Sequence, residues 1–260
     1  MAALRRRPRV DRAAGRAGDA RLPLRRAPDL RCHRPRRRQL PQTDRGRPVT
    51  LLLLRHGESE GNVARVVQGG LTHFALTSLG REQAEAAARR LATVEVDALY
   101  SSHLRRARET ADIVATHSGL EVIELPDLQE YGFGEAQGLT WDEVSARFEV
   151  VGRAWGRGHI PGEEGSTAFR DRVARQIGEL AERHENGTAV AVLHGGVIGA
   201  TVARICKLAD TEYAQIYTAN CGITEVGVAQ DGRLTLRSLN DTCHLRALGG
   251  PQTEPWLSEA

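Results

Sequence analysis

Four consecutive leucines that run into an Arg-His pair constrain the fold of this chain more than any other feature. The largely apolar segment 49–54 closes at Arg55, His56 and Gly57. An apolar run of this length before a glycine is typical of a strand that a parallel sheet buries on both faces. Ligands of open α/β sheets bind beyond the carboxyl ends of such strands, where Arg55 and His56 would lie. On its own, the segment is equally consistent with a charged, solvated strand end.

Strand and helix patterns alternate along the rest of the chain. They predict helices near 60–67, 78–92, 104–118, 140–148, 167–184 and 196–206, and strands at 96–100, 121–125, 188–193, 223–228 and 234–239. Ser78 is the predicted cap of its helix, and the last two strands form a predicted hairpin. This alternation predicts an α/β fold, a three-layer α/β/α sandwich with a mostly parallel central sheet. The glycine-rich excursion 130–165 is typical of a lid or binding loop.

The distribution of charge divides the chain into two parts. Residues 1–48 contain 16 Arg, no Lys and four Asp, whereas residues 49–260 contain 20 basic and 29 acidic residues, so the net charge of +3 hides an acidic domain. The first segment has too few large apolar residues to fold alone, which predicts a disordered extension. A nucleic-acid-binding arm is the alternative. The segment has no aromatic residue for base stacking, so nucleic acid is not an expected partner.

Composition excludes several other classes of protein. No segment has the apolar length of a membrane span, and no secretory signal peptide is recognisable. The chain has four scattered cysteines: Cys32, Cys206, Cys221 and Cys243. Their spacing indicates neither a metal site nor a disulfide framework. We therefore expect a cytoplasmic protein with no metal and no cofactor, with one domain at 49–245 and a C-terminal tail at 246–260. Nothing in the sequence predicts an oligomeric state.

Three predicted strand-to-helix junctions carry residues suited to anion binding. These residues are Arg55, His56 and Asn62 at the first junction, Ser101, Ser102, Arg105 and Arg106 at the second, and His194, Gly195 and Gly196 at the third. Strands of a parallel sheet deliver such junctions to one crevice. Arginine forks, histidines and the free N–H groups of a helix N-terminus all bind anions. We therefore expect these residues to form one phosphate-binding site.

Four stretches share their order and spacing with a known family: Leu54–Ser59, Leu76–Gly80, Ser101–Ala111 and His194–Val197. On these stretches, the chain from about 49 to 240 resembles the histidine phosphatase superfamily, the phosphoglycerate-mutase-like proteins of branch 1. The resemblance implies that the domain at 49–245 is catalytic. It implies a metal-independent phosphatase, that is, a phosphomonoester hydrolase that acts on a small phosphorylated metabolite.

The resemblance also implies roles for individual residues. His56 would be the nucleophile and would form a phosphohistidine that water then hydrolyses. Arg55, Arg106 and His194 match the phosphate pocket of the family, and Asn62 matches an additional phosphate contact. A cationic His194 would suit this role and would raise activity at mildly acidic pH.

Two of these assignments choose between neighbouring residues. The family pattern selects Arg106 over Arg105, for which the alternative is a solvated helix residue. It selects Glu130 as the general acid over Glu135, for which the alternative is a surface carboxylate. A general acid must stay protonated until it donates, which partial burial would favour. For Glu58 we expect a structural role in anchoring its loop.

Residues outside the phosphate pocket bear on the substrate. Gly69 and Asn220 stand where relatives place substrate-side contacts, although a turn before a strand explains Asn220 equally well. Gly199 replaces a frequent arginine, Glu163–Ser166 replaces the more usual Gly-Gly-Glu-Ser, and the excursion 130–165 looks shorter than the lid of cofactor-dependent mutases. These departures favour hydrolysis over phosphotransfer of the phosphoglycerate mutase type. A non-enzymatic scaffold that binds nucleic acid through the Arg-rich segment is a third alternative, which the complete set of pocket residues disfavours.

Overall fold

The computed structural model describes residues 49–148, 158–184, 187–208 and 216–250, which belong to one compact unit. The predicted disordered extension at 1–48 lies outside the described residues, as does the part of the predicted tail at 251–260. A six-stranded sheet forms the centre of the domain. Its strands are β1 (Val49–Arg55), β2 (Ala98–Ser101), β3 (Val122–Glu124), β4 (Thr188–Leu193), β5 (Ile223–Val228) and β6 (Leu234–Asp241).

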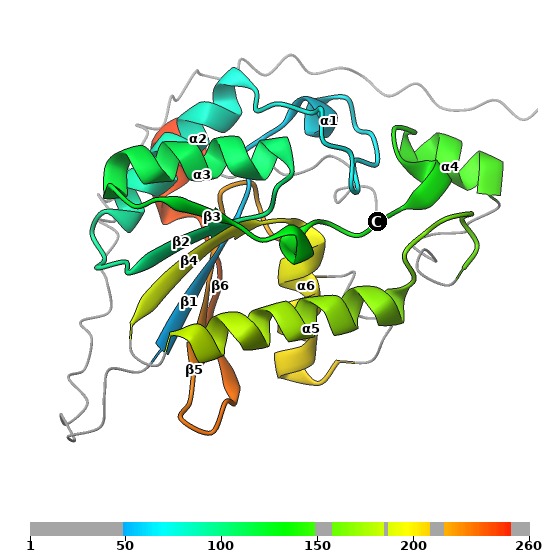
Figure 1. The fold of residues 1–260 in the computed structure, drawn as a ribbon. Coiled ribbons are helices and arrows are strands. Elements are labelled where there is room, and N and C mark those ends of the chain that lie inside the picture. The colour runs from blue at the N-terminus through cyan, green and yellow to red at the C-terminus, as the bar shows by residue number, and fades with distance from the viewer. Residues whose placement is uncertain (1–48, 149–157, 185–186, 209–215, 251–260) are drawn as a thin grey trace, which may run out of the picture. The chain divides into compact units, whose positions relative to one another are not determined.

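Helices cover both faces of this sheet (Figure 1). Helices α2 (Ser78–Leu91) and α3 (Arg105–Ser118) pack together on one face, and α5 (Ser166–Arg183) and α6 (Gly195–Cys206) pack together on the other. The shorter elements are α1 (Glu60–Val63), α4 (Trp141–Phe148) and the 3-10 helices η1 (Pro126–Leu128), η2 (Gly134–Ala136) and η4 (Cys243–Leu248). The predicted three-layer α/β/α sandwich is therefore confirmed. The described fold continues past the predicted boundary at 245, because η4 runs across it.

The central strands explain why the sheet carries helices on both faces. Leu51 and Leu53 of β1 belong to the core cluster shared with α5 and α6, whereas Leu52 and Leu54 belong to the cluster under α2 and α3. Successive side chains of a strand point to opposite faces, so a continuous apolar run is stable only where both faces are covered. Each of these leucines is fully or almost fully buried and contributes about 2 kcal/mol to folding.

The strand order β3-β2-β4-β1-β5-β6 brings the three predicted junctions together. Strands β3, β2, β4 and β1 pair in parallel, β5 runs antiparallel to β1, and β5 and β6 form the predicted hairpin. The register places Arg55 opposite Leu193 and Ser101 opposite Val192. The chain segments that follow β2, β4 and β1 therefore emerge side by side at one edge of the sheet. The prediction of a mostly parallel sheet is confirmed.

Two local predictions were wrong. The helix expected at 60–67 is only the four-residue α1. Its successor Arg65 adopts a left-handed φ of 56°, which ends the helical turn. The cap of α2 is Thr77 rather than Ser78, because the Thr77 hydroxyl accepts the N–H of Gly80 at 2.9 Å. The other predicted elements are confirmed, with small shifts at their ends.

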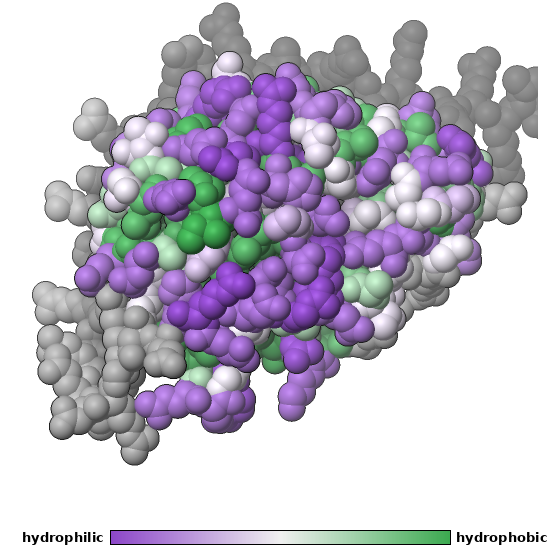
Figure 2. Space-filling view, viewed as in Figure 1, coloured by the Kyte–Doolittle hydropathy of each residue, from purple (hydrophilic) through white to green (hydrophobic). Residues whose placement is uncertain are grey.

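The face of the molecule in Figure 2 is largely hydrophilic. An apolar patch lies over the region where Figure 1 labels β2 and β3, and Ile123 of β3 is 44% exposed. Strand β3 is a sheet edge of only three residues, and such short edges limit pairing with other chains. None of the helices in the described part of the chain combines the length and apolar character needed to cross a membrane.

Candidate active site

His56 lies immediately after β1, and its imidazole is almost fully buried. Its Nδ1 lies 2.7 Å from the carbonyl oxygen of Gly57. Since a carbonyl can only accept, Nδ1 carries the proton and Nε2 is the unprotonated nitrogen of the neutral ring. The N–H of Gly57 donates in turn to the Thr110 hydroxyl at 3.0 Å. The loop therefore fixes both the ring and its tautomer, and leaves Nε2 for a substrate.

The surroundings of His56 keep its ring uncharged. Burial lowers the pKa of His56 well below its usual range, and the neighbouring Arg106 and Arg55 lower this pKa further. The hydrogen bond to Gly57 raises the pKa, but it is the smallest of these effects. Burial and nearby cations both disfavour a protonated imidazole. His56 is therefore neutral at neutral pH, which is the form a nucleophile requires.

Two buried arginines lie beside this imidazole. Arg55 donates from Nη1 to the carbonyl of Thr218. Arg106, in the first turn of α3, donates to the carbonyls of Gly69 at 2.8 Å and Leu71 at 3.0 Å. Burial lowers the pKa of Arg106 to about 10, so the side chain stays cationic at neutral pH. Its Nε is buried and has no hydrogen-bond partner among the described residues, which leaves one donor of a fixed cation for an anion.

His194 stands between β4 and α6, with its ring centroid 5.2 Å from that of His56. Its Nε2 lies 2.9 Å from the Ser102 hydroxyl, which accepts the N–H of Leu104 at 3.3 Å. Because the Ser102 oxygen already accepts this N–H, we assign its hydroxyl proton to the bond with Nε2, which places the proton of a neutral His194 on Nδ1. This Nδ1 is buried and has no partner in the described part of the chain. It is a second donor available to an anion.

The surroundings of His194 disfavour the expected cationic form. Burial lowers the pKa of His194 well below its usual range, and Arg106, His56 and Arg55 lower this pKa further. The physical reason is the same as for His56, since a buried ring among cations cannot easily gain a charge. A neutral His194 can still hold an anion through Nδ1–H.

Glu130 lies on the loop that follows η1 and reaches the N-terminus of α6. One carboxyl oxygen accepts the N–H of Gly196 at 2.9 Å, and the other accepts the N–H of Tyr131 at 2.9 Å. Gly196 is two residues from His194, and the charge of Glu130 raises the pKa of Arg106. The structure therefore brings the predicted general acid to the site that holds the two histidines.

The predicted substrate-side residues lie next to these side chains and make local hydrogen bonds. The amide of Asn220 donates to the carbonyl of His56 at 3.0 Å and lies 3.4 Å from the side-chain oxygen of Asn62. Asn62 forms a capping box with Ser59 at the start of α1. Gly69 has a left-handed φ of 47°, and its carbonyl accepts a hydrogen bond from the Arg106 guanidinium. Contact of these three residues with a substrate stays a prediction.

The competing residues lie outside the pocket. Arg105 has a side chain that is 54% exposed and pairs with Glu109 at 2.7 Å. Glu135 is exposed and forms a surface ion pair. Glu58 accepts the Thr77 hydroxyl at 2.7 Å and so ties the loop after β1 to the N-terminus of α2. The geometry thus groups Arg106 and Glu130 with the two histidines and leaves Arg105 and Glu135 on the surface.

Comparison with known proteins agrees with this geometry. Residues 51–242 match the histidine phosphatase superfamily (branch 1). The chain belongs to this superfamily. It is therefore a histidine phosphatase superfamily enzyme, and its fold and family resemblance are confirmed.

Relatives of this chain include proteins named as phosphatases and proteins named as mutase-like. A metal-independent phosphoserine phosphatase of Arabidopsis thaliana is 32% identical over 206 residues, which cover 76% of this chain and 84% of the relative. Phosphoglycerate mutase-like protein 4 of the same plant is 35% identical, with coverage of 76% and 88%. The solved structure of a phosphoserine phosphatase from Entamoeba histolytica, in complex with 3-phosphoglyceric acid, superposes with a TM-score of 0.65 at 30% identity and covers 76% of this chain and 99% of that chain.

Three residues with side-chain hydroxyls contact the predicted site residues, and two of them, Thr110 and Thr218, are absent from the expectations above. Ser102 bonds to His194, Thr110 accepts the N–H of Gly57 in the loop after His56, and Thr218 accepts a hydrogen bond from Arg55 through its carbonyl. The first two lie inside the matching stretch after β2, and Ser102 is already among the residues expected at the second junction. Thr218 lies in a segment without a periodic pattern, and nothing in the sequence pointed to it.

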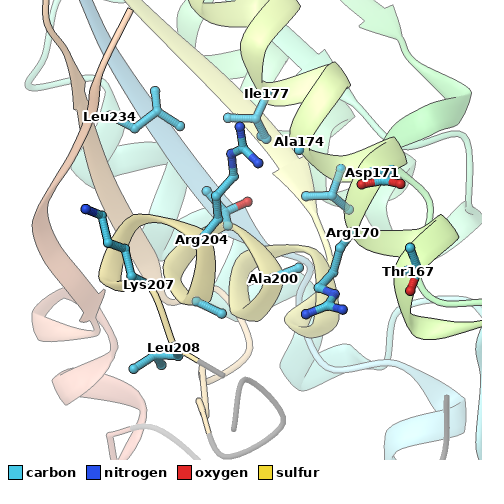
Figure 3. A pocket seen from close by; sticks show the side chains of 13 residues that line it. Thr167, Arg170, Asp171, Ala174, Ile177, Ala200, Arg204, Lys207, Leu208 and Leu234 are labelled. Carbon is cyan, nitrogen blue, oxygen red and sulfur yellow. The ribbon is translucent and has the colours of Figure 1, made fainter. Parts of the chain in front are cut away.

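A separate groove of about 230 Å³ lies between α5 and α6, beside β6 (Figure 3). Its lining includes the charged residues Arg170, Arg204 and Lys207 and the apolar residues Ile177 and Leu234. None of the phosphate-pocket residues lines this groove, so it is not part of the histidine phosphatase site. Within the described ranges, no group of three or more His, Cys, Asp or Glu side chains is arranged to hold a metal ion.

Proposed function

We propose that this enzyme is a metal-independent phosphomonoester hydrolase that cleaves a small phosphorylated metabolite through a phosphohistidine at His56. The observation that supports this proposal most directly is a pair of unsatisfied buried nitrogens, Arg106 Nε and His194 Nδ1, beside a neutral His56. Buried polar groups are normally hydrogen-bonded. Two such donors in one pocket indicate an anion that completes them, and a phosphoryl group has three oxygens that can accept both.

The first half-reaction transfers the phosphoryl group to the enzyme. Nε2 of His56 attacks phosphorus in line with the ester oxygen, so that the N–P bond forms as the P–O bond breaks. The departing oxygen takes a proton from the carboxyl group of Glu130 and leaves as an alcohol, a contribution worth about 10²–10⁴-fold in rate. Arg55 and Arg106 neutralise the charge on the equatorial oxygens, and the bond from Nδ1 to the Gly57 carbonyl stabilises the positive charge that develops on the ring.

The second half-reaction returns the enzyme to its starting state. The carboxylate of Glu130 accepts a proton from water as the water oxygen attacks the phosphohistidine. The N–P bond breaks, inorganic phosphate leaves, and His56 is again neutral with Nε2 unprotonated. Glu130 regains the proton that it gave in the first step, so the cycle consumes only ester and water.

One feature of the chain supports hydrolysis over phosphotransfer within a phosphoglycerate. Gly199, which stands where an arginine is frequent, is buried in α6 and offers no cation to a second anionic group of the substrate. The phosphoserine phosphatases among the relatives agree with hydrolysis. The mutase-like relative keeps a mutase as the second candidate.

Trapping the phosphoenzyme tests the proposed mechanism. The protein is mixed with radiolabelled phosphoserine or p-nitrophenyl phosphate and denatured in alkali, which preserves phosphohistidine. Wild type should retain label that acid removes, whereas His56→Ala should retain none and should lose about 10⁴-fold or more in kcat/KM. Arg105→Ala is the matched control and should behave like wild type. Turnover without label in wild type, or label in His56→Ala, contradicts the mechanism.

A second assay separates hydrolase from mutase. With 3-phosphoglycerate as the probe, a hydrolase releases inorganic phosphate faster than it moves phosphate to the 2-position. Positional exchange that outpaces phosphate release would establish the mutase and overturn hydrolysis as the main reaction.

A further inference from the structure

Arg172 projects from α5 into the domain, and its side chain is only 10% exposed. Its guanidinium donates to three backbone carbonyls, those of Asp127 at 2.7 Å, Gln129 at 3.0 Å and Glu130 at 3.4 Å. These carbonyls belong to the segment that leads into and includes Glu130. Burying a guanidinium is costly unless its N–H groups are hydrogen-bonded. These bonds therefore hold the backbone at 127–130 in a fixed position against α5.

Glu164 pairs with this guanidinium and holds the chain on the other side of Glu130. The pair is bidentate, with Nε to Oε1 at 2.7 Å and Nη2 to Oε2 at 2.9 Å. The Glu164 carboxylate also accepts the N–H of Gly132 at 3.1 Å, and the Glu164 N–H donates to the Gly132 carbonyl at 2.8 Å. Bidentate Arg–carboxylate pairs fix geometry as well as charge. Glu164 and Arg172, here called the clamp, therefore grip the backbone both before and after Glu130.

Tyr131, the residue after Glu130, also joins this loop to the segment that carries Glu164. Its ring is 1% exposed and packs edge-on against Phe133 and Phe169. Its hydroxyl donates to the carboxylate of Glu163 at 2.9 Å and accepts the N–H of Gly165 at 2.9 Å. The segment that supplies Glu164 is thus joined to the segment that carries Glu130 at several points.

The carboxyl group of Glu130 depends on this backbone for its position. Among the described residues, its hydrogen bonds come from two backbone N–H groups, one of the adjacent Tyr131 and one of Gly196 in α6. A shift of the loop would move the carboxyl group along with the Tyr131 N–H. A displacement of about 1 Å in a reacting group can cost about 10²-fold in rate.

We propose that the clamp is a positioning device for proton transfer, which holds the Glu130 carboxyl group where the leaving oxygen of the substrate departs. Glu164 and Arg172 act through Glu130 and do not themselves touch the reacting atoms. The inference rests on the proposed function, because it requires Glu130 to be the general acid.

Comparing leaving groups tests the clamp directly. A p-nitrophenolate departs without protonation, whereas the alkoxide of an alkyl ester such as phosphoserine must be protonated as it leaves. Arg172→Lys keeps the charge but loses the fork, and Glu164→Gln keeps the shape but loses the charge. Each variant should lose about 10-fold or more in kcat/KM on phosphoserine and stay within about 3-fold of wild type on p-nitrophenyl phosphate.

Two controls make the outcome decisive. Arg175→Lys alters an exposed ion pair of the same helix with Asp127 and should leave both rates unchanged. Glu130→Gln should show the same selective loss as the clamp variants, only larger. If Glu130→Gln is selective but the clamp variants lose both esters equally or neither, the clamp inference alone is overturned. If Glu130→Gln shows no selectivity, Glu130 is not the acid, and the proposed role of Glu130 fails together with the clamp.

Discussion

His56 and His194 lie buried beside Arg55 and Arg106, and this arrangement decides their protonation. Burial and the two cations all disfavour charged imidazoles, so the pocket holds its positive charge on the arginines and keeps the histidines neutral. One ring can then act as a nucleophile and the other as a neutral hydrogen-bond donor. A phosphate ester supplies the negative charge that the pocket lacks.

The depressed pKa of His56 predicts how catalysis depends on pH. Because the pKa of His56 lies well below its usual value of 6.5, the ring stays unprotonated as pH falls through that value. The acid limb of kcat/KM, which reports the free enzyme, should therefore have its midpoint below about pH 6.5 after correction for ionisation of the substrate. Steady-state rates across pH measure this. A midpoint at or above the ordinary histidine value would show that the pocket does not depress the pKa.

The second prediction concerns the tautomer of His194. Ser102→Ala removes the hydroxyl that places the proton on Nδ1. Loss of one buried hydrogen bond of about 1–1.5 kcal/mol should lower kcat/KM about 5- to 10-fold. Ser101→Ala is the matched control, because among the described residues this buried hydroxyl bonds to the Ser102 carbonyl and not to His194. Equal losses in both variants would contradict the assigned tautomer.

Helix α6 links the sheet to the carboxylate of Glu130, the proposed general acid. It follows His194 directly, and the N–H of Gly196 in its first turn binds Glu130. A Cβ atom at Gly196 would lie 2.2 Å from a carboxyl oxygen of Glu130, so only glycine lets the carboxylate approach this N–H. The first turn of this helix therefore positions two of the proposed site residues, His194 and Glu130.

Two glycine substitutions test the role of α6. Gly196→Ala should displace the Glu130 carboxyl group and lower kcat/KM on phosphoserine by about 10²-fold. Gly178→Ala in α5 is the control, because its added Cβ meets nothing within 4 Å. This control should keep full activity and gain about 0.5–1 kcal/mol in free energy of unfolding. Denaturant titration and kinetics on both variants measure the outcome, and an active Gly196→Ala enzyme would contradict the close approach.

The elements differ in how far the sequence predicts them. Strands β1 and β4 were predictable because their apolar runs and terminal histidines are local patterns, and the parallel order followed from alternation with helices. The left-handed turn at Arg65 and the choice of Thr77 as a cap depend on tertiary contacts that no local pattern records. The clamp could not be predicted either. Glu164 lies on a loop and Arg172 on α5, and their contacts with the segment around Glu130 form only in the packed fold.

Histidines with depressed pKa values make the stability of the whole domain depend on pH. In the part of the chain that the structure describes, four histidines have pKa values below their ordinary value of 6.5: His56, His184, His194 and His244. Below that pH the unfolded chain binds protons that the folded chain does not, so the free energy of unfolding falls as pH drops. This loss of stability is absent at pH values above the pKa of the histidines in the unfolded chain. It grows as pH falls toward their lower pKa values in the folded chain.

Thermal unfolding between about pH 7 and pH 5 tests this linkage, because the perturbed carboxylates titrate below that window. The Tm of wild type should fall as pH is lowered, and a His56→Asn, His194→Asn double variant should show a weaker dependence. A Tm that stays constant or rises over this range in wild type would contradict the depressed pKa values.

The stereochemistry at phosphorus tests the central claim, covalent transfer to His56, most directly. A phosphorothioate ester labelled with two oxygen isotopes is hydrolysed in water that contains the third, and the configuration of the inorganic thiophosphate is then determined. Two successive in-line displacements, one by His56 and one by water, predict overall retention of configuration. Inversion would mean that water attacks the ester in a single step, and it would contradict the phosphohistidine mechanism.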